Sequence, residues 1–171
     1  MGFAVFTLSR RQKLDAGYPE SRECDDFVRN VTEELAAKGR VIIQTVDDLE
    51  EMEDAARMAR DFGIPESEIS SHVASNISEL TLRILNSAHI GSLVVFGGDT
   101  LHSILRGIRC EGVIPALELA PGVVASQVLA HNHTPVMITK SGGLGSDDVL
   151  DVIDSFLNSE ELSRKIQAGE N

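Results

Sequence analysis

The residues best placed to do chemistry lie in two glycine-rich segments, each of which follows an apolar run. Residues 97–100 (Gly-Gly-Asp-Thr) follow residues 93–96 (Leu-Val-Val-Phe). Residues 139–148 (Thr-Lys-Ser-Gly-Gly-Leu-Gly-Ser-Asp-Asp) follow residues 135–138 (Pro-Val-Met-Ile). Each pattern predicts a strand, a turn and then a helix, and free backbone N–H groups and the helix dipole at such a point favour an anion. Because glycine has no Cβ, a phosphate can approach the backbone closely.

The first segment combines several useful groups at one point. Gly97 and Gly98 leave the backbone open, and the Thr100 hydroxyl could donate to a phosphate oxygen. The Asp99 carboxylate could approach a metal ion bound to phosphates. The alternative interpretation is a plain strand-to-helix turn with Asp99 as its N-cap, because short glycine motifs also occur without a ligand.

The second segment is the more specific of the two. Lys140 lies at a predicted strand end and is followed by the hydroxyl of Ser141 and by three glycines, Gly142, Gly143 and Gly145. This combination suits a phosphate cradle. Its order differs from that of the Walker A loop and from that of the dinucleotide-binding fingerprint. The alternative is a plain glycine loop without a ligand.

The sequence predicts no metal site. His131 and His133 form a His-x-His pair, but no third ligand lies near them, so we interpret the pair as the polar tip of a hairpin. Cys24 and Cys110 are far apart and show no metal-binding spacing, and we expect two reduced thiols.

Composition restricts the class of protein and its partners. A length of 171 residues with 42% hydrophobic residues suits one domain, residues 1–171, with a substantial core. The net charge of -12 argues against nucleic acid and anionic membranes as partners, but a nucleotide needs only local donors. No apolar stretch is long enough to span a bilayer, and residues 1–9 lack the features of a signal peptide. The expected location is the cytoplasm.

Strands alternate with helices along most of the chain. Hydrophobic periodicity and turn residues predict strands over residues 3–8, 40–46, 92–96, 113–119, 123–130 and 135–139. They predict helices over residues 21–38, 47–60, 66–88, 147–157 and 160–171, and turns over residues 9–20. A further short helix is expected after the first glycine turn and through Ile108. We therefore expect an α/β fold of three layers, with a mostly parallel sheet, helices on both faces and an antiparallel hairpin in the C-terminal third. Pro115 marks the strand over residues 113–119 as an edge or irregular strand.

Three motifs in order carry a family resemblance. They are residues 94–100 (Val-Val-Phe-Gly-Gly-Asp-Thr), 118–123 (Glu-Leu-Ala-Pro-Gly-Val) and 140–145 (Lys-Ser-Gly-Gly-Leu-Gly). Together they resemble the C-terminal nucleotide-binding domain of the four-carbon acid sugar kinase family, and the resemblance is strongest over residues 40–158. Leu144 stands where that family usually has phenylalanine.

The resemblance implies a transferase of carbohydrate metabolism that phosphorylates four-carbon sugar acids, such as threonate or erythronate, with ATP. Magnesium is expected with ATP, and neither a metal ligand nor a catalytic residue is assigned. The implied nucleotide-binding residues are Gly97, Gly98, Asp99, Thr100, Pro121, Gly122, Lys140, Ser141, Gly142, Gly143 and Gly145.

The chain departs from the family in two respects. The family carries an additional N-terminal domain that binds the sugar acid, for which we expect no room in 171 residues. Residues 6–12 also lack the family's Gly-Ser pair, although Arg10, Arg11 and Gln12 match. We therefore expect the chain to be inactive by itself and to need a separate sugar-acid-binding domain or subunit, and we consider a homodimer.

Two other functions compete with the kinase hypothesis. The chain could be a non-catalytic regulatory module that binds a nucleotide or a phosphorylated metabolite and is derived from the kinase domain. A relation to lipid or NAD kinases is disfavoured, because Thr100 follows Asp99 directly and the second glycine segment has a different sequence.

Overall fold

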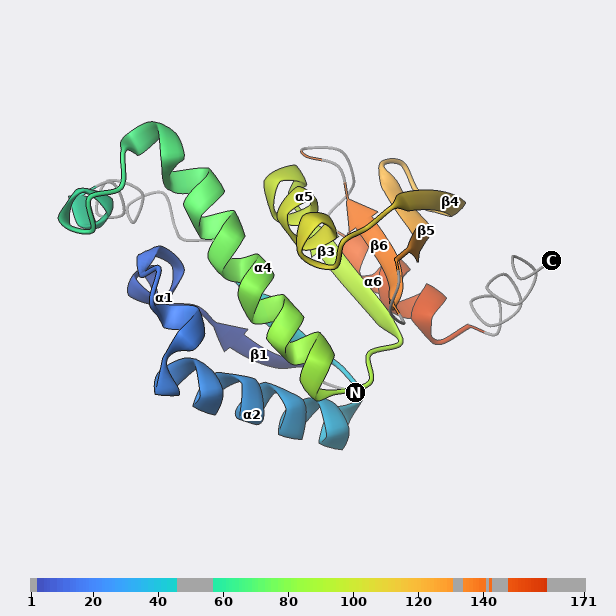
Figure 1. Cartoon of the computed structure of the whole chain (residues 1–171). Coiled ribbons are helices and arrows are strands. Elements are labelled where there is room, and N and C mark those ends of the chain that lie inside the picture. Colours follow the sequence, from blue (N-terminus) through green and yellow to red (C-terminus); the bar gives the residue numbers. More distant parts are fainter. Residues whose placement is uncertain (1–2, 46–56, 131–133, 141, 143–147, 160–171) are drawn as a thin grey trace. The chain divides into compact units, whose positions relative to one another are not determined.

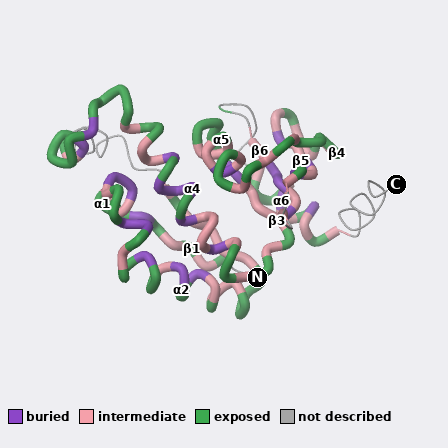
Figure 2. Tube along the Cα trace, in the orientation of Figure 1, coloured by how far each residue is buried: buried purple, intermediate pink, exposed green. Residues whose placement is uncertain are grey.

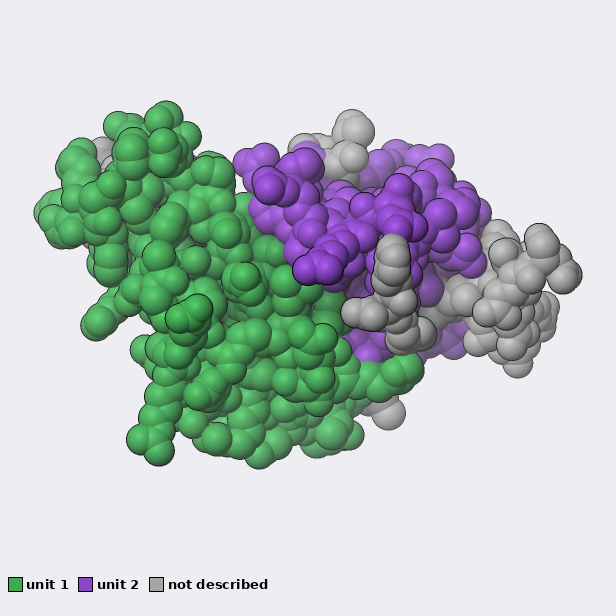
Figure 3. All heavy atoms as spheres, viewed as in Figure 1, with its two compact units in different colours: residues 1–89 green, residues 90–171 purple. Residues whose placement is uncertain are grey.

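The computed structural model describes residues 3–45, 57–130, 134–140, 142 and 148–159. The chain divides into two compact units, Met1–His89 and Ile90–Asn171 (Figure 3). Among the described residues, the first unit holds a two-stranded sheet and the second a four-stranded sheet (Figure 1). No helix within the described ranges is both long and apolar enough to cross a membrane.

The first unit pairs a short parallel sheet with helices. Strands β1 and β2 are parallel, with Ala4 opposite Val41. Helix α2 connects them and contacts both strands, as a parallel crossover requires. The elements are β1 (Ala4–Thr7), α1 (Arg10–Leu14), the 3-10 turn η1 (Tyr18–Glu20), α2 (Arg22–Lys38), β2 (Val41–Gln44), the 3-10 turn η2 (Glu66–Glu68) and α4 (Ile69–Ser87). Residues 57–61 are also helical.

Local signals place the ends of the two long helices where the sequence predicts them. At the start of α2, the Ser21 hydroxyl accepts a hydrogen bond of 3.1 Å from the backbone N–H of Cys24. At its end, Gly39 adopts a φ of 76°, a left-handed conformation that favours glycine. The long helix expected over residues 66–88 is η2 followed by α4. Buried and exposed residues alternate along α4, as its apolar spacing predicts (Figure 2).

The expectation of turns over residues 9–20 is wrong, because this segment forms α1 and η1. A capping box starts α1. The backbone N–H of Ser9 donates to Gln12 Oε1 at 2.7 Å, and the backbone N–H of Gln12 donates to Ser9 Oγ at 3.3 Å. The Ser-x-x-Gln spacing was a signal for this helix that the analysis of periodicity missed.

Helix α4 holds the α1 segment through two polar side chains. The buried Asn76 amide donates to the backbone carbonyls of Lys13 and Asp15 at 3.0 and 2.9 Å. One turn earlier, His72 Nε2 lies 2.8 Å from the carbonyl oxygen of Leu14. Carbonyls at a helix end have no partner within the helix, so these side chains satisfy groups that α1 leaves open.

The second unit contains a mixed sheet with the strand order β3-β6-β5-β4. Strand β3 is parallel to β6, whereas β5 is antiparallel to both β6 and β4. The elements are β3 (Ser92–Phe96), α5 (Gly98–Gly107), β4 (Gly112–Ala120), β5 (Val123–Leu129), β6 (Val136–Lys140) and α6 (Val149–Leu157). The predicted α/β class, with both parallel and antiparallel strands, is confirmed.

This sheet is covered on both faces, which makes the second unit three-layered. Met137 and Ile138 are adjacent on β6 and almost fully buried, so their side chains point to opposite faces. Met137 packs in one apolar cluster with Ile104 of α5. Ile138 packs in another with Ile153 and Phe156 of α6. The helices that follow the two glycine segments therefore cover the two faces of the sheet.

Strand β4 lies at the edge of the sheet, as Pro115 predicts. Its pairing with β5 shifts register between Pro115 and Leu117 and again between Glu118 and Ala120. The antiparallel pair expected from residues 123–130 and 135–139 is confirmed as β5 and β6. The antiparallel pairing of β4 with β5 has no counterpart among the strand pairs expected from the sequence.

Some expectations lie outside the described residues. They concern most of the helix over residues 47–60, the helix over residues 160–171, and the hairpin tip with His131 and His133.

Replacing Asn76 should destabilise the first unit. We expect Asn76→Leu to lower the free energy of unfolding by about 1–3 kcal/mol, because the Lys13 carbonyl loses the Asn76 amide and the Asp15 carbonyl keeps only the Tyr18 N–H as a donor. Leucine has the same number of side-chain heavy atoms as asparagine but cannot donate. Tyr18 is the only tyrosine of the chain and there is no tryptophan, so tyrosine fluorescence in a urea titration reports on this unit. The control is Ser75→Ala at the preceding, exposed position. Equal urea midpoints for the two variants would contradict the bridging role.

The two thiols should react at very different rates. Both cysteines are free; Cys24 is fully buried, and burial raises the pKa of its thiol, whereas Cys110 is half-buried. The thiolate is the reactive form, so a raised pKa and burial both slow the reaction. We expect a thiol reagent to label one cysteine in the native protein and the second only on unfolding. Cys110→Ser should remove the fast phase, and loss of the slow phase instead would contradict the assignment.

Candidate functional site

The sheet of the second unit brings three turns to the carboxyl ends of its two parallel strands. This end of the sheet, at Phe96 and Lys140, is the edge meant in the description of the site. Strands β3 and β6 are parallel neighbours (Figure 1). Their last residues, Phe96 and Lys140, are register partners. The strand residues from which the two glycine segments begin therefore lie side by side. Strand β5 is antiparallel to β6, and its first residue, Val123, also faces Lys140. The turn at residues 121–122, which enters β5, lies at this same edge.

The first glycine turn opens directly onto the start of α5. Gly97 has a φ of 99°, which residues with a Cβ rarely adopt, and it occupies the N-cap position. Among the residues that the structure describes, none lies within 4 Å of a Cβ added to Gly98. No described side chain makes a hydrogen bond at the N-cap of the helix. Its first N–H groups therefore face an accessible point of the edge.

Asp99 does not cap this helix. The alternative that makes Asp99 the N-cap is wrong, because Gly97 holds that position and Asp99 lies in the first turn of α5. Asp99 is exposed, whereas Thr100 is half-buried. The carboxylate therefore lies at the edge of the sheet without the structural role that the simpler interpretation gave it.

Lys140 links the ends of the two parallel strands. Its Nζ lies 6.0 Å from the centroid of the Phe96 ring, so a cation faces an aromatic ring across the strand pair. The same Nζ donates to the carbonyl oxygen of Gly142 at 2.6 Å. Gly142 has a φ of 31°. The ammonium group is thus held where the second glycine segment begins.

The third turn is held by a carboxylate. Gly122 adopts a φ of 76°, and its N–H donates to Glu118 Oε1 at 3.4 Å. Glu118 lies on β4, so the side chain spans the turn that joins β4 to β5. Pro121, at the tip, is exposed.

The structure thus gathers most of the predicted site residues at one edge of a single sheet. Those brought together are Gly97, Gly98, Asp99, Thr100, Pro121, Gly122, Lys140 and Gly142. Ser141, Gly143 and Gly145 lie outside the described residues. The sequence analysis did not assign Phe96 to the site. Its signal was an aromatic residue at a strand end next to a glycine turn.

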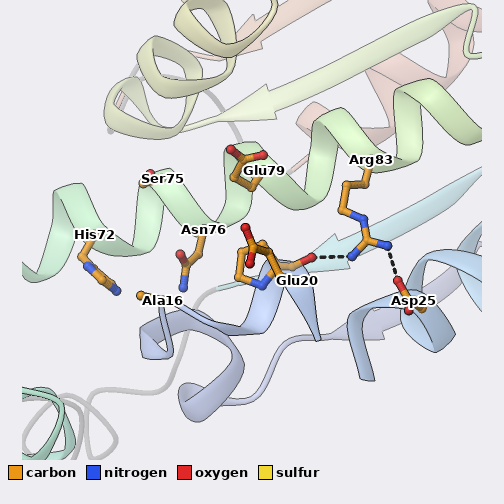
Figure 4. A pocket seen from close by; sticks show the side chains of 9 residues that line it. Ala16, Glu20, Asp25, His72, Ser75, Asn76, Glu79 and Arg83 are labelled. Carbon is orange, nitrogen blue, oxygen red and sulfur yellow. Dashed lines mark hydrogen bonds and ion pairs between the residues drawn. The ribbon is translucent and has the colours of Figure 1, made fainter. Parts of the chain in front are cut away.

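A separate pocket of about 580 Å³ lies in the first unit, where the sequence analysis predicted no site. Arg83 of α4 crosses it to donate to the Pro19 carbonyl and to pair with Asp25, as Figure 4 shows. Asn76 and His72, which also line it, contact the α1 segment. These side chains hold α1, η1 and α2 against α4, so we assign the pocket a structural origin.

Comparisons with known proteins show to which family the chain is similar. The family described as the nucleotide-binding C-terminal domain matches residues 4–150. The D-erythronate kinase of Heliobacterium modesticaldum is 29% identical over 110 residues, which is 62% of this chain and 25% of that protein. The D-threonate kinase of Salmonella typhimurium is 25% identical over 158 residues, which is 87% of this chain and 36% of that protein.

A solved structure shares the fold. The crystal structure of a Haemophilus influenzae protein matches with a TM-score of 0.70 at 15% identity, covering 90% of this chain and 34% of that one. The matched segments of this chain span between a quarter and slightly more than a third of the length of these two kinases. The family match extends over most of the chain and over all three motifs. The chain belongs to the nucleotide-binding C-terminal domains of the four-carbon acid sugar kinase family.

Proposed function

We propose that this chain is the ATP-binding domain of a kinase that phosphorylates four-carbon sugar acids of the threonate or erythronate type. The observation that carries the proposal is the meeting of three turns at one sheet edge, where Phe96, Lys140 and Val123 are register partners. Residues 1–171 act in this proposal as one nucleotide-binding domain. The family match across both units supports that view.

The phosphate chain of the nucleotide lies at the N-terminus of α5. The N–H groups of the first turn donate to its oxygens, and the absence of a Cβ at Gly98 lets a phosphate approach. Lys140 supplies the positive charge at the same edge. These local donors offset an overall charge of -12, so an acidic protein can bind an anion.

The remaining predicted residues complete the proposed site. The Thr100 hydroxyl donates to a phosphate oxygen, and Pro121 and Gly122 line the nucleotide pocket. Ser141, Gly143 and Gly145 belong to the second glycine segment and bind phosphate through hydroxyl or backbone groups. Phosphoryl transfer depends mainly on positioning and on neutralisation of charge, which is what such an arrangement supplies.

Magnesium enters the proposal with ATP. No group of three or more His, Cys, Asp and Glu among the described residues could hold a metal ion by itself. The exposed carboxylate of Asp99 fits a metal whose other ligands are phosphate oxygens and water, as magnesium prefers. The ion would neutralise charge on the phosphates.

The sugar acid is bound elsewhere in this proposal. The relatives are about three to four times as long as their matched segments, and we propose that a separate domain or subunit holds the acceptor. A homodimer and a cytoplasmic location are part of the same proposal. A regulatory module that binds the nucleotide without transferring phosphate is the alternative.

The glycine at the start of α5 provides a direct test of nucleotide binding. We expect the wild-type chain to bind Mg-ADP in calorimetry, and Gly98→Ala to weaken binding about ten- to hundredfold, because the added methyl group blocks the helix N-terminus. The substitution should leave stability unchanged or raise it by up to about 1 kcal/mol, since the new Cβ meets no neighbour.

Gly91→Ala is the matched control for this experiment. Gly91 precedes β3 at the opposite end of the strand, and a Cβ there would also have no described residue within 4 Å. We expect its affinity for ADP to equal that of the wild type. A wild-type chain without measurable binding, or equal losses in the two variants, would refute the proposed site.

Phosphate transfer tests where the acceptor is held. We expect this chain, supplied with Mg-ATP and either D-threonate or D-erythronate, to bind nucleotide without forming a phosphorylated acid, because the acceptor needs a further domain. Radiolabelled ATP and separation of the products measure the transfer. Turnover by the chain itself would show that it also binds the sugar acid.

A further inference from the structure

Phe96 is placed unlike the other apolar residues of its strand. Leu93, Val94 and Val95 all pack in the two apolar clusters of the second unit. Phe96, the last residue of β3, is 44% exposed and lies next to the first glycine turn. Burying an aromatic ring stabilises a fold, so a ring left half in water at this edge is not explained by the core.

The ring of Phe96 faces the side chain of Lys140. Among the described site residues, Lys140 alone carries a positive charge. Lys140 Nζ lies 6.0 Å from the ring centroid and donates to the Gly142 carbonyl oxygen. Lysine has a long stem with many rotamers, and ordering it on binding costs free energy. A ring face and a carbonyl that already hold the ammonium reduce that cost.

We propose that Phe96 is a positioning residue that holds the Lys140 ammonium group between the two glycine turns, where it meets the phosphate chain of the nucleotide. This inference rests on the proposed function. In it, Phe96 acts through Lys140 and does not itself touch the nucleotide. The phosphate oxygens replace the Gly142 carbonyl as acceptors for Nζ, while the ring continues to support the cation.

The competing role for an exposed aromatic residue at such an edge is direct stacking on the base. The two roles make opposite predictions. A residue that acts through Lys140 affects ligands with phosphates and has no effect once Lys140 is removed. A stacking residue affects adenosine as well and acts whether or not Lys140 is present.

The test is a double-mutant cycle with three ligands: Mg-ADP, Mg-pyrophosphate and adenosine. We expect Phe96→Leu to lower the affinity for ADP and for pyrophosphate about two- to fivefold, as the loss of a cation–π contact at an exposed site predicts. Phe96→Tyr keeps the ring face, so this variant should bind both ligands as tightly as the wild type does. In the Lys140→Met background, Phe96→Leu should cause no further loss, and adenosine binding should not change in any variant. Phe62→Leu, the same change at another exposed phenylalanine, is the control.

Two outcomes would overturn the inference while leaving the proposed function intact. In the first, Phe96→Leu lowers the affinity for ADP equally in the wild-type and Lys140→Met backgrounds. In the second, Phe96→Leu lowers the affinity for adenosine. Wild-type protein that binds neither ADP nor pyrophosphate refutes the proposed function itself, and the phosphate role of Lys140 with it. NMR tests the contact without a nucleotide: the ε-methylene protons of Lys140 should be shifted upfield in the wild type and in Phe96→Tyr, but not in Phe96→Leu. Absence of that shift would overturn the inference regardless of the binding data.

Discussion

The candidate site depends on the parallel pairing of β3 with β6. Parallel strands end at the same edge of a sheet, and the register that places Phe96 opposite Lys140 also places both glycine segments there. Parallel neighbours need a long connection, and here α5, β4 and β5 form it. Buried residues of both strands, among them Val95 of β3 and Met137 of β6, pack in one apolar cluster and hold the pair in place. A slip of one residue would turn these side chains to the other face, so core packing fixes the register.

The other strands extend the same edge. Strand β5 returns antiparallel beside β6, which brings the turn at residues 121–122 to the ends of both parallel strands. Strand β4 tolerates Pro115 because it lies outermost, where a missing donor costs little. Helices cover both faces of the sheet, so its edge is where a ligand can reach backbone donors. An anion site can form there in an acidic protein, because it depends on oriented N–H groups and one nearby cation.

Local signals were the most predictable part of this chain. Ser21 and Gly39 mark the ends of α2, and each acts on groups within one helical turn. Pro115 marked an edge strand for a similar reason. The start of α1 was also local, since Ser9 and Gln12 cap it, but its apolar pattern was too short to be recognised by periodicity. The partner of β5 could not be predicted in this way, because strand pairing joins residues that are distant in sequence.

The sequence by itself determined the class of fold, most of the helices and strands, and the three motifs that mark the family. These depend on composition, on periodicity and on contacts between neighbours along the chain. Only the tertiary structure decided that the described residues of the three motifs meet at one edge, that Gly97 rather than Asp99 occupies the N-cap of α5, and that Phe96 faces Lys140. The reason is physical: strand order and register follow from long-range packing of two apolar faces, which no local pattern specifies.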